Sequence, residues 1–87
     1  MPDYIVISEL VVTREQSIPH RAEHLEYLES LKRNGSLKVA GRYKDGTGGL
    51  YVINAENIEK AEEIARNDPY HKLRLRKYTV REWERVF

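Results

Sequence analysis

The chain has 87 residues, with 15 Lys and Arg against 14 Asp and Glu, so its net charge at pH 7 is only +1. This balance argues against nucleic acid as the main partner, and the absence of cysteine excludes disulfides and thiolate catalysis. No apolar run approaches membrane-spanning length, and no basic-then-apolar segment opens the chain. We therefore expect one domain over residues 1–87, cytoplasmic and without a membrane partner, whose small core favours association with a second copy.

The first half of the chain predicts a strand followed by a helix. Residues 4–12 are rich in β-branched side chains and are apolar on both alternating faces, which predicts a strand covered on both sides. Residues 13–19 are predicted to form a loop. Pro19 suits the first turn of a helix, which should extend to about Arg33 and stop at the "NG" that follows.

The second half predicts two strands, a helix and a final strand. Strands near 36–43 and 49–54 flank the turn cluster "KDGTGG" and should form a hairpin. Asn57 is a good cap for the following helix, and Pro69 should end it because the residue before a proline avoids the helical region. The last strand is expected near 74–82.

The resulting order, β-α-β-β-α-β, is typical of the ferredoxin-like α+β fold. Two helices would cover one face of a four-stranded antiparallel sheet. No third helix is predicted for the other face, so a second copy, packed sheet against sheet, is the natural cover. The expected assembly is a homodimer.

The first predicted helix carries two polar residues on its apolar face. Leu25, Leu28 and Leu31 form a stripe, His24 falls inside it, and Arg21 lies close to its centre. His24 is either a hydrogen-bonded core histidine or an acid–base group, since histidine titrates near neutral pH. Arg21 either reaches solvent from the first turn or requires an anionic partner or ligand.

Asp68 has two interpretations. Followed by Pro69, it suits the N-cap of a short turn at "PYHK". Alternatively, it orients His24 and stabilises its charge. His24 should lie roughly 8 Å along its helix and Asp68 roughly 15 Å along the next, at its far end. The two helices should run the same way about 8–10 Å apart, so contact through a water or a substrate is feasible, and a direct hydrogen bond stays open.

A metal site is a weaker hypothesis. His20 and His24 are four residues apart, which can place two ligands on one helix face, and Asp68 or His71 could complete a site. No HExxH motif or further ligand cluster supports it. We therefore expect no metal and no cofactor.

Several segments together resemble the YciI-like (YCII-related) family. "RAEHLEYL" resembles its R-x-x-H-L-x-x-L motif, "NGSLKVAGRY" its G-x-L…A-G segment, "ARNDPYHK" its A-x-x-D-P-Y motif, and "REWERVF" its aromatic ending. The similarity runs over nearly the whole chain with the same spacing. It departs from the family where Arg42 replaces the usual proline after the A-G pair.

This resemblance implies a ferredoxin-like subunit that pairs into a dimeric α/β barrel, with further assembly in some relatives. The family's proposed active site is a histidine–aspartate pair, which maps onto His24 and Asp68. The motif arginine and tyrosine map onto Arg21 and Tyr70, and a strand-end glycine maps onto Gly41. Relatives in the wider superfamily include muconolactone isomerases, dehalogenases, small-molecule monooxygenases and ligand-sensing domains.

Two functions are compatible with these residues. The first is a cofactor-independent enzyme in which His24 and Asp68 transfer protons on a small, partly apolar anionic molecule, by proton transfer, elimination or lactone isomerisation. Arg21 would neutralise the anion, while Tyr70 and Gly41 would line the pocket. The alternative is a non-catalytic dimeric module that binds a small molecule or a protein partner in the same pocket.

Overall fold

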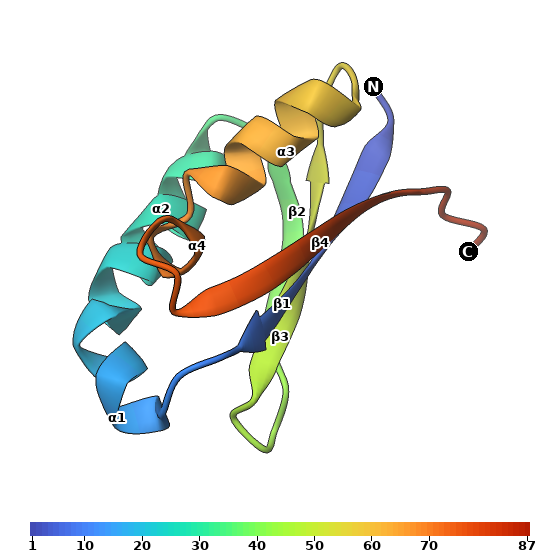
Figure 1. The fold of residues 1–87 in the computed structure, drawn as a ribbon. Helices are drawn as coiled ribbons and strands as arrows, with labels where there is room; N and C mark the ends of the chain where they lie inside the picture. The colour runs from blue at the N-terminus through green and yellow to red at the C-terminus, as the bar shows by residue number, and fades with distance from the viewer.

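A computed structural model describes all of residues 1–87 and shows one four-stranded antiparallel sheet (Figure 1). The strand order is β2-β3-β1-β4, so the two central strands are β3 and β1. The predicted ferredoxin-like α+β fold is therefore confirmed. The strand bounds lie within two residues of those predicted: β1 (Asp3–Leu10), β2 (Leu37–Arg42), β3 (Gly48–Asn54) and β4 (Arg76–Trp83).

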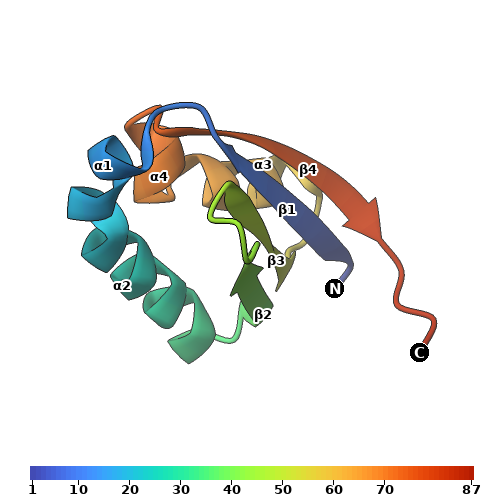
Figure 2. The same ribbon diagram turned by 90° about the horizontal axis from the view of Figure 1, so that it is seen from below.

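All helices lie on one side of the sheet (Figure 2). The two long helices follow the predicted segments, and short helical turns precede α2 and follow α3. None of them is long and apolar enough to cross a membrane. The helices are α1 (Arg14–Ser17), the 3₁₀ helix η1 (Ile18–His20), α2 (Arg21–Arg33), α3 (Ile58–Arg66) and α4 (Pro69–Lys72).

The loop predicted over residues 13–19 is wrong, because this segment forms α1 and η1. Thr13 caps α1: its hydroxyl accepts a hydrogen bond from the backbone N–H of Gln16 at 3.2 Å. The Gln16 side chain in turn accepts from the Thr13 N–H at 3.0 Å, which completes a capping box. This T-x-x-Q spacing is a local sequence signal for a helix start.

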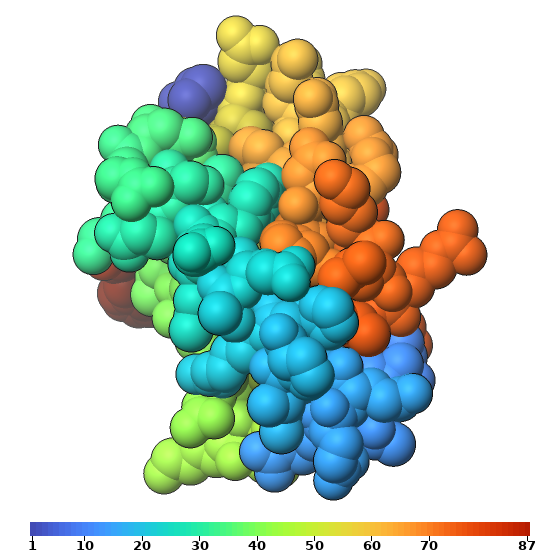
Figure 3. All heavy atoms as spheres, turned by 90° about the vertical axis from the view of Figure 1, so that its left-hand side faces the viewer, coloured from blue at the N-terminus to red at the C-terminus, as the bar shows by residue number.

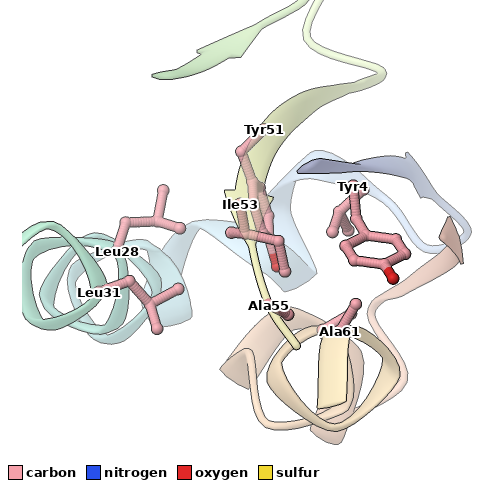
Figure 4. Packing of buried hydrophobic residues seen from close by; sticks show 9 residues of the cluster. Tyr4, Leu28, Leu31, Tyr51, Ile53, Ala55 and Ala61 are labelled. Atoms are coloured by element: carbon pink, nitrogen blue, oxygen red, sulfur yellow. The ribbon is translucent and has the colours of Figure 1, made fainter. Parts of the chain in front are cut away.

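The core lies between the sheet and the two long helices (Figure 4). Tyr4, Tyr51 and Ile53 of the central strands pack here with Leu28 and Leu31 of α2 and with small residues of α3. The alanines at positions 61 and 65 allow α3 to approach the sheet closely. Leu25, expected in the same stripe, is 47% exposed, so the start of α2 does not face the solid core.

The opposite face of the sheet is uncovered by any helix (Figure 2). Side chains alternate between the two faces of a strand, so residues 5 and 7 of β1 point away from the helices. Their neighbours on this outer face include Val39, Leu50 and Trp83, which are 59%, 37% and 39% exposed. The predicted two-sided apolar character of the first strand thus has a structural counterpart.

Candidate active site

A cavity of about 300 Å³ opens between the sheet, α1, the start of α2 and the β2–β3 hairpin. In Figure 3 the hairpin, in yellow-green, lies beside α1 and the first turns of α2, in blue. Four of the five predicted site residues line this cavity, namely Arg21, His24, Gly41 and Tyr70. The fifth, Asp68, is fully buried and contacts His24.

His24 and Asp68 are directly hydrogen-bonded, with 2.9 Å between the imidazole Nδ1 and the carboxylate Oδ1. His24 lies in the first turn of α2, and Asp68 is the N-cap of α4, where it also accepts from the Tyr70 backbone N–H at 3.0 Å. Asp68 is therefore an N-cap and a direct hydrogen-bond partner of His24 at the same time. The cap fixes the carboxylate, and the carboxylate fixes the histidine.

Tyr51 is a third partner of Asp68 that the sequence analysis did not identify. Its hydroxyl donates to Asp68 Oδ2 at 3.0 Å from the central strand β3. A tyrosine in an apolar strand gives no sequence signal for such a contact. Only the packing of β3 beneath α4 brings the hydroxyl to the carboxylate.

The carboxylate of Asp68 is held in its charged form. Burial by itself would raise its pKa, but the hydrogen bond and charge interaction with His24, with smaller contributions from His71 and the Tyr70 N–H, bring the pKa below the usual value. Burial and the negative charge of Asp68 raise the pKa of Tyr51, so its phenol stays protonated. The charged Asp68 carboxylate thus contacts the His24 ring, the Tyr51 hydroxyl and the Tyr70 backbone N–H.

Only one of the two ring nitrogens of His24, Nδ1, has a hydrogen-bond partner in the protein. Because Nδ1–H donates to Asp68, the neutral ring carries its lone pair on Nε2, which has no hydrogen-bond partner in the protein. The ring stacks on Tyr70 with 4.2 Å between centroids, and its side chain is 13% exposed, at the cavity. Nε2 of His24 is therefore the ring nitrogen that a molecule in the cavity could contact.

The cavity is strongly cationic. Arg14, Arg42 and Arg76 line it in addition to Arg21, and no aspartate or glutamate does. None of these four arginines forms an ion pair within the protein. Of these four arginines only Arg21 was predicted to bind an anion, although Arg42 was noted as the replacement of a proline expected from the family pattern. The electrostatics of the cavity favour an anionic ligand.

A second histidine, His71, lies close to the cavity and is hydrogen-bonded to Ser8. Ser8 on β1 is within 2.8 Å of His71 Nε2, and His71 Nδ1 donates to the Ala65 carbonyl at 2.7 Å. Both ring nitrogens of His71 are therefore engaged. Burial is the main cause that lowers the pKa of His71, so the ring is neutral near pH 7.

The metal hypothesis is not supported by the side-chain positions. No group of three or more His, Cys, Asp or Glu side chains is arranged to hold an ion. His20 Nδ1 lies 3.5 Å from Glu23, while His24 Nδ1 is bonded to Asp68. His20, His24 and His71 therefore belong to three separate pairs rather than to one ligand set.

Comparison with known proteins places the chain in a family. The YCII-related domain model matches residues 4–84, so the chain belongs to the YCII-related family. It is also 40% identical over 65 residues to Uncharacterized protein YjpA of Bacillus subtilis (strain 168), a match covering 75% of this chain and 76% of YjpA. The resemblance identified from the sequence motifs is confirmed.

Two solved structures share the architecture. The 5-chloro-2-hydroxyhydroquinone dehydrochlorinase TftG of Burkholderia phenoliruptrix AC1100, in complex with 2,5-dihydroxybenzoquinone, superposes with a TM-score of 0.81 at 26% identity, over 94% of this chain and 93% of TftG. Muconolactone isomerase superposes with a TM-score of 0.73 at 14% identity, over 95% and 88% of the two chains. The fold is thus shared with two enzymes that act on small molecules.

Proposed function

We propose that the protein is a cofactor-independent enzyme that uses the His24–Asp68 pair for proton transfer on a small, partly apolar anionic molecule. The observation that carries this proposal is the hydrogen bond from His24 Nδ1 to a fully buried carboxylate, which leaves Nε2 free at a cavity. The reaction class is proton transfer, elimination or lactone isomerisation. TftG and muconolactone isomerase, which share the fold, bear names that fall within these classes.

Each predicted residue has a role in this proposal. His24 Nε2 removes or delivers the proton, and Asp68 holds the ring in one tautomer and stabilises its charged form. Arg21 binds an anionic oxygen of the substrate. The Tyr70 ring supports the imidazole from its stacked face, and Gly41 leaves space at the wall formed by β2.

The experiment is an assay of wild-type protein against a panel of muconolactone, 5-chloro-2-hydroxyhydroquinone and simple enolisable acids, followed by NMR in D₂O. For any compound turned over, His24→Ala should reduce kcat/KM by about 100-fold or more, the usual contribution of a general acid–base residue. Glu29→Gln, an exposed change on the same helix, is the matched control. Undiminished turnover by His24→Ala would contradict the proposal.

The alternative function is a binding module that uses the same cavity without proton transfer. If no compound of the panel is turned over but one of them binds, this alternative is favoured. In that case His24→Gln, which keeps a hydrogen-bonding side chain, should leave the affinity nearly unchanged.

We also propose that the protein is a homodimer formed through the outer face of the sheet. Val39, Leu50 and Trp83 are exposed there, although apolar side chains of this size normally contribute to a core or an interface. Packing against a second sheet would complete a barrel.

Light scattering of the purified protein tests this assembly. Wild type should have the mass of two chains or a multiple of it, and Val39→Glu should shift the mass toward one chain. Val11→Glu, an equally exposed valine beyond the end of β1, is the control and should leave the mass unchanged. A monomeric wild type would contradict the proposal.

A further inference from the structure

Arg76 on β4 is a half-buried guanidinium without a counter-ion. Its Nε is buried and has no hydrogen-bond partner, and its Nη1 approaches only the Ser8 hydroxyl, at 3.5 Å. Its Cζ lies 4.2 Å from the centroid of the Tyr70 ring. A guanidinium removed from water normally pairs with a carboxylate, but none lies within ion-pair distance of Arg76, and Asp68 acts on it only from farther away.

Ser8 cannot serve as the donor for an anion at this end of the cavity. His71 donates from Nδ1 to the Ala65 carbonyl, so its Nε2 accepts the Ser8 hydroxyl proton. Ser8 then presents only lone pairs, which orient the Arg76 guanidinium. Arg76 is therefore the group beside Ser8 that can meet a negative charge.

The opposite edge of the sheet supplies a second arginine. Arg42 on β2 pairs in register with Gly49 on β3, and Gly49 pairs with Ser8 on β1. Arg42 and Ser8 both line the cavity. On the edge strand β4, Tyr78 is in register with Ser8, and Arg76, which also lines the cavity, lies two residues away, opposite Leu10. The backbones of the two edge strands are three strand spacings apart, about 14 Å.

Gly49 lines the cavity between the two edge strands and has no side chain that could project into it. A Cβ on Gly49 would lie 2.3 Å from the Gly41 carbonyl oxygen, so only glycine fits this close approach of β2 and β3. With no side chain at Gly49 and a small one at Ser8, a ligand can lie across the sheet. Arg76 and Arg42 then reach toward it from opposite edges.

We propose that the cavity binds a doubly anionic small molecule, with one acidic group at Arg76 and the other at Arg42. The inference rests on the proposed use of the cavity as the substrate site, but it does not depend on proton transfer by His24. Arg42 is exposed, like Arg14 and Arg21, and is chosen because it lies on the edge strand opposite Arg76, while Arg14 and Arg21 add positive potential from the helical side. Burial lowers the pKa of Arg76, a cost that an anion bound beside it would offset.

The test compares dicarboxylates with their half-amides, which have nearly the same size but one charge fewer. Calorimetric titrations with succinate, glutarate and adipate, each beside its mono-amide, should show a preference of about tenfold or more for at least one diacid, which corresponds to about 1.4 kcal/mol. Arg76→Gln and Arg42→Gln should each remove most of this preference. Arg66→Gln, a change at the end of α3 away from the cavity, should retain it.

Further variants separate this inference from other causes. Arg76→Lys keeps the charge and should retain part of the preference, even if Arg76→Gln is unstable. His24→Ala should retain all of it, so a failure of the proton-transfer proposal would be recognised separately. Equal affinity for diacids and half-amides, no binding by either series, or an unchanged preference in both glutamine variants would overturn the inference.

Discussion

His24, which is half-buried at the cavity, and His71, which is buried, each stack on a tyrosine but differ in their hydrogen bonds. Each stacks on a tyrosine, with centroid distances of 4.2 Å to Tyr70 and 4.4 Å to Tyr78. His24 donates to a charged carboxylate and keeps Nε2 free at the cavity. The other ring donates to a backbone carbonyl and uses its second nitrogen to accept from Ser8.

The two rings thus differ both in the partner of Nδ1 and in burial. The Asp68 carboxylate accepts the Nδ1–H of His24, which is the geometry that the proton-transfer proposal requires. His71 donates to a neutral carbonyl instead. That hydrogen bond raises the pKa of His71, but burial has the larger effect and lowers it. The first ring has the geometry that the proposed proton transfer needs, and the second links β1 to the α3–α4 region through Ser8 and Ala65.

The largest effect is expected from Asp68→Asn, which removes the carboxylate that distinguishes the surroundings of His24 from those of His71. The carboxylate accepts from three donors, on His24, Tyr51 and Tyr70. An amide places an N–H where one of those donors points, so we expect a loss of about 3 kcal/mol in the free energy of unfolding, measured in urea. The ¹⁵N shifts of His24 should also show a mixture of tautomers.

Glu29→Gln is the control for this change, because it neutralises an exposed carboxylate on α2. If Asp68→Asn costs no more stability than Glu29→Gln, the buried network does not hold the site together.

A smaller effect is expected from Tyr51→Phe, which removes one donor from Asp68 and leaves the ring in the core. The free energy of unfolding should fall by about 2 kcal/mol, since the lost hydrogen bond has a charged acceptor. Tyr43→Phe, at a 37% exposed tyrosine, is the matched control. A loss as small as that of the control would show that Tyr51 is only a packing residue.

The smallest expected effect is a pH dependence of the free energy of unfolding that comes from His71. Because the pKa of His71 is lowered in the fold, the unfolded chain binds a proton first as the pH falls. Stability should therefore be fully present above about pH 6.5 and decline below it, by up to about 1.4 kcal/mol for each pH unit. His71→Gln should flatten this slope in urea unfolding between pH 7 and pH 5.

Asp68 acts in a separate pH window, so the two groups can be told apart. Its lowered pKa contributes stability above about pH 3.9, and that contribution is lost only as the pH falls further. A decline between pH 7 and pH 5 that persists in His71→Gln would contradict the assignment to His71.

The sequence by itself determined the order of elements and most of their bounds. Runs of β-branched and apolar residues predicted the strands, Asn57 marked the start of α3, and Pro69 and the glycine-rich turn marked where a helix and a strand end. It also singled out His24 and Asp68, since polar residues at apolar helical positions and beside a proline are visible locally. The α1 helix was missed although its capping box is local, because the segment was interpreted from its turn-forming residues.

Tertiary structure alone decided how these residues meet. The direct bond from His24 to Asp68 and the added donor Tyr51 depend on how α2, α4 and β3 pack, which no local pattern encodes. The exposure of Leu25 likewise follows from the cavity beside α2 rather than from helical periodicity. Arg76 alternates in sequence as an ordinary strand residue, and only its burial without a counter-ion marks it as a site for an anion.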